Sequence, residues 1–185
     1  MSRSSGLAPS RGESGAVERF AIADLALCPH SVDTIARWHH KECLRQGLNS
    51  RYERRRERLS QHLSVEQSVP RTWVVVDRQA GAAVGCVSLI SYHVGGAGQA
   101  LAPDTPLWLS NLYLESEFRG LGLASFLIDT VVDHTLGLGL DSLWLTATEK
   151  TDYYQRRGWQ RVRRVRLGGQ WVNVMCRQLG PGSRQ

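Results

Sequence analysis

The stretch Leu112-Tyr-Leu-Glu-Ser-Glu-Phe-Arg-Gly-Leu-Gly-Leu-Ala-Ser125 is the most informative part of the chain. It joins an apolar, β-favouring run, 107–114, to a helical pattern through a turn of glycine and alanine. Glycine lets a ligand approach successive backbone N–H groups, because it has no Cβ. At the first turn of a helix, these groups and the helix dipole favour a bound anion such as a pyrophosphate. The alternative is a tight turn without a ligand, since short glycine patterns are common.

The surroundings of the turn argue against two well-known phosphate-binding loops. No Lys-Ser or Lys-Thr follows the glycines, as it does in the loop that holds nucleotide β- and γ-phosphates. A dinucleotide-binding turn opens a βαβ unit and is followed, about 20 residues on, by an acid for the ribose. Asp141 lies at roughly that distance, but the turn lies in mid-chain, after several predicted strands.

A second motif, Tyr153-Tyr-Gln-Arg-Arg-Gly-Trp159, follows about 30 residues further on. Together, Arg119-x-x-Gly-x-Ala124 after an apolar strand and this aromatic-Tyr-x-x-x-Gly-aromatic segment resemble the GNAT N-acetyltransferase superfamily, over roughly residues 19–179. The resemblance implies one α/β domain with a mixed, partly antiparallel central sheet flanked by helices. It also implies transfer of an acetyl group from acetyl-CoA to a primary amine. We expect the amine to attack acetyl-CoA directly in a ternary complex, because no Cys or Ser lies near the motifs in a setting that would suggest an acyl-enzyme intermediate.

The resemblance places the acetyl-CoA along the first motif. The backbone of 112–114 would hold the pantetheine arm as an added strand, and the Leu114 N–H would polarise the thioester carbonyl. The turn at 119–125 would offer N–H groups to the pyrophosphate. The expected cofactor-binding residues are Leu112, Tyr113, Leu114, Arg119, Gly120, Leu121, Gly122, Leu123, Ala124 and Ser125. The alternative role of Leu112 and Leu114 is packing in the hydrophobic core. Their side chains can pack while their backbone binds the cofactor, so the two roles are compatible.

Tyr154 is the expected catalytic residue. By resemblance, it matches the tyrosine with which family members protonate the sulfur of CoA. A phenol with a pKa of about 10 can fill this role against a thiol with a pKa of about 8.5. The alternative is a tyrosine whose ring fills space beneath the sheet, a role for which Tyr153 is the better candidate.

Some members of the family that the chain resembles carry a glutamate early in this strand. The strand 107–114 contains no acid, so the sequence does not assign a general base. Besides a chain of water molecules, the candidates are Glu115, Glu117, Asp104 and His93. His93 and Asp104 are also the candidate acceptor-binding residues, and Asp104 could attract a cationic amine. The arginine-rich predicted helix 50–63 borders the acceptor groove by resemblance, and would favour an acidic acceptor instead.

Length and composition fit one soluble domain: 185 residues, of which 42% are hydrophobic and 22% charged. We expect a disordered tail over 1–18, the N-acetyltransferase domain over 19–179 and a C-terminal tail over 180–185. No run approaches the ~18 apolar residues of a membrane span, and the N-terminal stretch lacks the apolar core of a secretory signal. The four cysteines are scattered without a Cys-x-x-Cys pair. These features predict a cytoplasmic protein.

The net charge of +6 is carried almost wholly by arginine. It suits an anionic cofactor better than nucleic acid, because no nucleic-acid-binding motif accompanies it. The expected partner is a small-molecule or peptide amine, with no nucleic acid and no membrane. His39, His40 and Cys43 lie on one predicted helix, where three ligands rarely enclose an ion, so no metal is expected. The rival interpretation is a non-catalytic module that senses CoA or binds nucleic acid on the same fold.

The remaining periodicity predicts the other elements. A helix is expected to begin at Ser31 as its N-cap, and others to cover 50–63, 122–136 and 151–157. The strands are expected over 19–27, 72–77, 83–93, 107–114, 142–146, 159–165 and 170–177.

Overall fold

Strand β2 (Arg71–Asp77) illustrates how the sheet divides the side chains between two cores. Trp73 and Val75 are buried in one cluster and Val74 in another, because successive side chains of a strand point to opposite faces. The computed structural model describes residues 19–92 and 106–180. The tail predicted over 1–18 lies outside these residues and stays a prediction.

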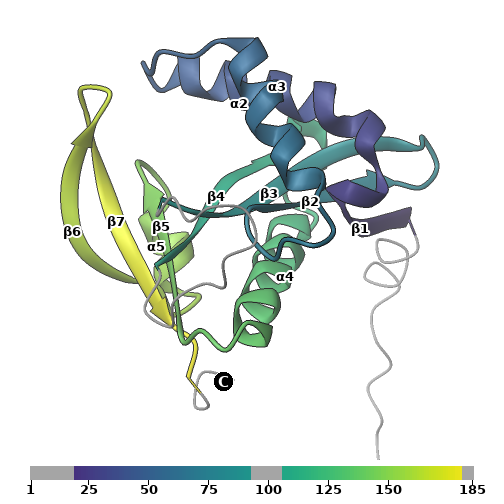
Figure 1. The fold of residues 1–185 in the computed structure, drawn as a ribbon. Helices are drawn as coiled ribbons and strands as arrows, with labels where there is room; N and C mark the ends of the chain where they lie inside the picture. Colours follow the sequence, from purple (N-terminus) through teal and green to yellow (C-terminus); the bar gives the residue numbers. More distant parts are fainter. Residues whose placement is uncertain (1–18, 93–105, 181–185) are drawn as a thin grey trace, which may run out of the picture.

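Within the described residues, seven strands form one sheet in the order β1-β2-β3-β4-β5-β7-β6 (Figure 1). Neighbours are antiparallel except for β4 and β5, which are parallel. The other strands are β1 (Phe20–Asp24), β3 (Ala82–Ser91), β4 (Leu107–Leu114), β5 (Ser142–Ala147), β6 (Gln160–Leu167) and β7 (Gln170–Gln178). The predicted mixed, partly antiparallel sheet is confirmed.

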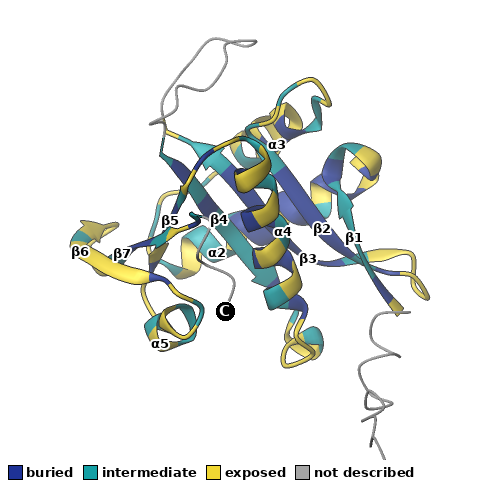
Figure 2. Ribbon diagram, turned by 90° about the horizontal axis from the view of Figure 1, so that it is seen from below, coloured by how far each residue is buried: buried dark blue, intermediate teal, exposed yellow. Residues whose placement is uncertain are grey.

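Helices cover both faces of the sheet. α2 (Val32–Arg45) and α3 (Tyr52–Ser60) lie on one face and α4 (Leu123–Gly137) on the other, while α5 (Thr151–Gln155) follows β5 (Figure 1). The face of α4 that meets the sheet is buried and the opposite face is exposed (Figure 2). The buried residues include Leu127 and Val131, which is the spacing that predicted a one-sided helix. No helix in the described ranges is both long and apolar enough to span a bilayer.

Several predicted boundaries shift, each for a local reason. The strand expected over 19–27 ends at Asp24, whose carboxylate accepts a hydrogen bond from the Ala26 N–H at 2.8 Å and opens a 3₁₀ turn, Leu25–Leu27. Ser31 precedes α2 as predicted but makes no side-chain cap, because its backbone already belongs to a 3₁₀ turn. The helix expected over 50–63 divides into α3 and a further 3₁₀ turn, Gln61–Leu63.

A β-bulge in β4 separates it from β5. Cys86 of β3 faces Tyr113 and Ser88 faces Ser110, so one β3 residue lies opposite two residues of β4. Asn111, in the bulge, has a φ of 54°, and its carbonyl oxygen accepts the Cys86 thiol at 3.6 Å. A bulge bends its strand and increases the twist. β4 accordingly pairs with β5 at one position, Trp108 opposite Trp144, and not over its remaining length.

Two histidines are buried in uncharged form between the helices and the sheet. His62 Nδ1 lies 2.8 Å from Thr72 Oγ1, which lies 2.8 Å from Ser88 Oγ. Burial lowers the pKa of His62 to about 4. Burial, aided by the nearby His62 and by the charge of Arg55, lowers the pKa of His39 to about 3.

These pKa values predict a loss of stability in mild acid. Between pH 6.5 and 5 the unfolded chain binds protons at these histidines and the folded chain does not, so the free energy of unfolding falls as the pH falls. Carboxylates titrate mainly below this window. Replacing His62 with Gln removes one of the two groups and should flatten this dependence, measured by urea denaturation at each pH. The exposed His30→Gln variant should keep the parent slope, and equal slopes for all three proteins would contradict the prediction.

Candidate functional site

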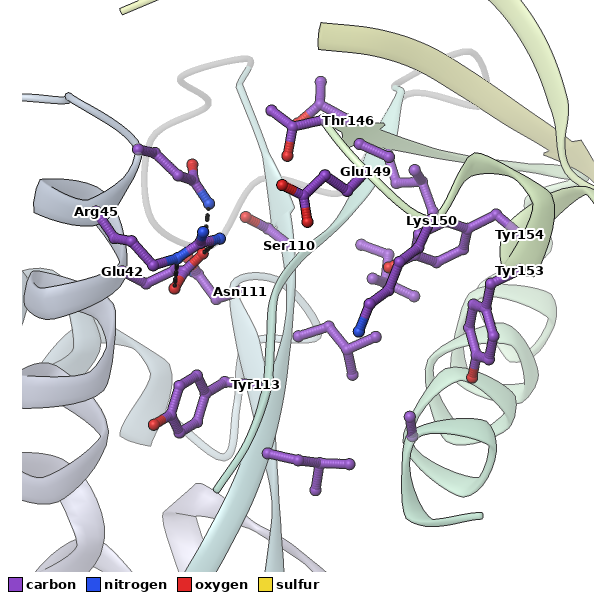
Figure 3. A pocket seen from close by; sticks show the side chains of 18 of the residues that line it. Glu42, Arg45, Ser110, Asn111, Tyr113, Thr146, Glu149, Lys150, Tyr153 and Tyr154 are labelled. Carbon is purple, nitrogen blue, oxygen red and sulfur yellow. Dashed lines mark hydrogen bonds and ion pairs between the residues drawn. The ribbon is translucent and has the colours of Figure 1, made fainter. Parts of the chain in front are cut away.

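A cavity of about 970 Å³ occupies the gap where β4 and β5 separate (Figure 3). Its walls come from α2, β4, the glycine turn, the start of α4, β5, α5 and the β6–β7 hairpin. One side chain of this wall, Tyr113, stacks on Trp38 of α2 with ring centroids 5.0 Å apart. Segments that are distant in sequence thus meet at the bulge.

The structure brings nearly all of the expected cofactor-binding residues to this cavity. Leu121 is the exception: it does not line the cavity and is 46% exposed. The residues that do line it are Leu112, Tyr113, Leu114, Arg119, Gly120, Gly122, Leu123, Ala124 and Ser125.

The glycine turn leaves open space in front of its backbone. Gly120 and Gly122 have φ values of 81° and 79°, a left-handed conformation that residues with a Cβ rarely adopt. A Cβ built at either position would meet no atom within 4 Å. Gly122 is the N-cap of α4 and has no side chain to cap the first helical N–H groups. The turn can therefore present N–H donors to an anion.

Positive side chains surround the start of α4. Arg157 donates to Ser125 Oγ at 2.7 Å, and its guanidinium lies 3.8 Å from the centre of the Tyr153 ring. Arg119 donates to the Leu114 carbonyl oxygen at 3.0 Å, and Lys150 extends into the cavity (Figure 3). Arg157 and Lys150 were missed by the sequence analysis, although Arg157 belongs to the second motif. This end of the cavity suits a ligand with several phosphates.

Tyr154 lines the cavity from α5, and its hydroxyl points toward β4 (Figure 3). Its ring meets those of Tyr153 and Trp159 edge-on, at centroid distances of 5.3 and 6.1 Å. Burial, reinforced by the nearby Tyr153, raises the pKa of Tyr154 to about 12, so the phenol is protonated at neutral pH. The Tyr153 hydroxyl points in another direction, is buried and has no hydrogen-bond partner among the described residues.

The candidate bases fare differently. His93 and Asp104 lie outside the described residues, and Glu115 and Glu117 do not line the cavity. Among the described residues, two other carboxylates line it, Glu42 of α2 and Glu149 between β5 and α5. Neither belongs to a motif, and the position of Glu149 between a strand end and Tyr154 is the one signal that could have indicated it.

The arginines of the predicted helix 50–63, which were expected to border the acceptor groove, do not line this cavity. None of the arginines between 51 and 58 lines the cavity, whose wall on this side is α2. Arg56 instead forms an ion pair with Asp33 at 2.6 Å, and Arg55 donates to Ser50 Oγ at 3.1 Å.

At the end of the cavity away from α4, two loops meet. Leu48, in the connection between α2 and α3, lies against the turn of the β6–β7 hairpin. A Cβ added to Gly168 in that turn would come within 2.3 Å of the Leu48 side chain. Leu48, Leu167 and Gln170 all line the cavity, so these loops bound the space opposite the glycine turn.

The three residues considered as metal ligands do not converge. His39 contacts Cys86 at 3.6 Å, whereas His40 Nδ1 lies 3.1 Å from Ser50 Oγ. Within residues 19–92 and 106–180, no group of three His, Cys, Asp or Glu side chains could hold a metal ion.

Solved structures with similar folds include several acetyltransferases. Aminoglycoside 6'-acetyltransferase type Ii is 15% identical, with a TM-score of 0.64 over 87% of this chain and 98% of that one. The Salmonella typhimurium protein yncA, determined with its cofactor acetyl-CoA, is 16% identical, with a TM-score of 0.65 over 90% and 97%. A chimera of the Vibrio cholerae spermidine N-acetyltransferase SpeG is 16% identical, with a TM-score of 0.59 over 87% and 96%.

These identities establish a likeness of fold alone. No curated protein matches the chain. The profile of the acetyltransferase (GNAT) family, however, matches residues 33–159, which is more than half of the chain and contains both motifs. The chain therefore belongs to the GNAT acetyltransferase family.

Proposed function

We propose that the protein is an N-acetyltransferase that moves the acetyl group of acetyl-CoA to a primary amine of a small molecule or peptide. The observation that carries the proposal is the meeting of three features in one cavity: the open glycine turn, the unpaired edge of β4 and the Tyr154 hydroxyl. Each supplies one requirement of acyl transfer, namely a phosphate site, oxyanion donors and a proton donor.

The direction of the β4 N–H groups supports the oxyanion site. The N–H of Glu115 donates to the Val84 carbonyl oxygen of β3 at 3.0 Å. Alternate N–H groups of a strand point to opposite edges, so the N–H of Leu114 points to the edge that β5 has left. In our proposal, this N–H polarises the thioester carbonyl and stabilises the oxyanion.

The proposed step is direct attack within a ternary complex. The neutral amine nitrogen attacks the thioester carbonyl carbon, and its extra proton passes to water. The carbon–sulfur bond then breaks, and the leaving thiolate takes the proton of the Tyr154 hydroxyl. Water returns a proton to the tyrosinate, whose high pKa restores the phenol.

A panel of amines tests the proposal. Purified protein with acetyl-CoA and each of a series of primary alkylamines, arylamines and peptide N-termini should release free CoA thiol with at least one acceptor, with a matching acetylated product by mass spectrometry. Acetyl-CoA binding by calorimetry, without turnover across the whole panel, would instead support the CoA-sensing module. Salt-dependent binding to nucleic acid without affinity for CoA would contradict both.

Substitution at Gly122 tests the pyrophosphate site. Gly122→Val places a branched side chain in front of the N–H donors, so we expect acetyl-CoA to lose at least about tenfold in affinity and to stop raising the Tm. Gly139→Val is the matched control, because Gly139 has a φ of 76°, has equally open surroundings and lies outside the cavity. It should suffer the same backbone strain and bind acetyl-CoA like the parent. Equal affinities of the two variants for acetyl-CoA would contradict the assignment of the glycine turn as the pyrophosphate site.

Removal of one hydroxyl tests the proton donor. Tyr154→Phe should lower kcat by about 100-fold and leave the affinity for acetyl-CoA nearly unchanged, because the hydroxyl acts only when the thiolate leaves. Tyr153→Phe removes a buried hydroxyl that has no partner among the described residues, and should keep kcat. Single-turnover kinetics separates chemistry from product release. An unchanged rate of chemistry in Tyr154→Phe would leave Tyr154 with a packing role only.

A further inference from the structure

Glu149 and Lys150 are adjacent in sequence, but their side chains extend into different parts of the cavity (Figure 3). Lys150 has a φ of 59° and a ψ of 28°, a left-handed conformation that costs energy in any residue with a Cβ. Figure 3 shows the Lys150 side chain extending along the cavity and the Glu149 carboxylate reaching across it toward Ser110. The connection between β5 and α5 therefore gives a cation to one part of the cavity and an anion to the other.

Among the described residues that line the cavity, Glu149 differs from Glu42 in that no hydrogen bond or ion pair holds its carboxylate, although it lies close enough to Arg45 to help raise the pKa of that guanidinium. Glu42 accepts two hydrogen bonds from Arg45, at 2.9 and 2.7 Å, and one from Gln46 at 2.8 Å. These bonds hold the pKa of Glu42 below its usual range and leave the Glu42–Arg45 pair close to neutral. Glu149 takes part in none of the ion pairs among the described residues.

The surroundings of Glu149 match the hydrogen-bonding needs of an ammonium group. An ammonium has three N–H donors and no acceptor. Glu149 reaches toward Ser110 across the cavity, so the carboxylate and the serine hydroxyl offer hydrogen-bond acceptors from facing walls (Figure 3), and Asn111 lines the same wall as Ser110. Ser110 and Asn111 lie directly before Leu112–Leu114, the segment to which we assign the thioester.

We propose that Glu149 binds the ammonium group of the acceptor, which passes one proton to water before the neutral amine attacks the thioester. Alkylamines carry a proton at neutral pH, as the lysine side chain does, whereas arylamines do not. This inference rests on the proposed acetyltransferase function and goes further by naming the residue that recognises the charge of the amine. It replaces the preference for acidic acceptors that the arginines of 50–63 suggested, since those arginines lie away from the cavity.

The test compares two isomers, 2-phenylethylamine and 4-ethylaniline, which differ in whether the amine is alkyl or aryl. The parent should acetylate 2-phenylethylamine with the lower KM, by an advantage that shrinks as salt is raised. Glu149→Gln should raise the KM for 2-phenylethylamine about three- to tenfold, a modest change because the carboxylate is exposed. It should change kcat less than twofold and leave the KM for 4-ethylaniline unchanged. Glu149→Lys should raise the KM for the alkylamine further.

Glu57→Gln is the matched control, because it removes the same charge from an exposed position on α3 outside the cavity. It should match the parent with both amines. Equal KM changes for both isomers in Glu149→Gln, a change in kcat alone, or a preference for the arylamine would overturn the Glu149 assignment while acetyl transfer itself remained. Binding of acetyl-CoA with no amine of either class acetylated would instead defeat the proposed function, and this inference with it.

Discussion

The incomplete pairing of β4 with β5 is the constraint on which the rest of the site depends. Two parallel strands that stayed paired would use their facing N–H and C=O groups on each other and would leave no gap. Here the bulge at Asn111 turns β4 aside after one paired position, Trp108 with Trp144. The cavity and its unpaired backbone donors follow from that divergence.

The left-handed conformation of Asn111 has support from outside its own strand. The Cys86 thiol of β3 donates to the Asn111 carbonyl oxygen, and His39 of α2 contacts the same thiol. Burial keeps His39 neutral and raises the pKa of the Cys86 thiol, so this contact adds no buried charge. A strained residue persists only where its neighbours hold it, and these two elements do so at Asn111.

The fold and the cofactor end of the site were accessible from sequence because each depends on local patterns. Apolar periodicity located the strands and α4, and the glycine turn must adopt a positive φ that few other residues accept. The acceptor end depends on contacts between distant segments. Glu42, Glu149 and Leu48 line the same cavity only because α2, β5 and the β6–β7 hairpin pack together. No spacing of residues in the sequence predicts this arrangement. The position of the α3 arginines outside this cavity could not be predicted for the same reason, since composition does not show which face of a helix carries its charged side chains.

The two ends of the cavity differ in how freely they can change. The glycine turn is constrained by backbone geometry, so substitutions there alter the conformation itself. The groups opposite it act through side chains on surface loops, where Glu149 can be exchanged without touching the sheet. Yet α2, which forms that wall, also stacks Trp38 on Tyr113 and places His39 against Cys86. Changes that move α2 would therefore reach the bulge and the N–H groups behind it, whereas changes in the β5–α5 connection would not. On this argument, acceptor preference is more easily altered from the side of Glu149 than from the side of α2.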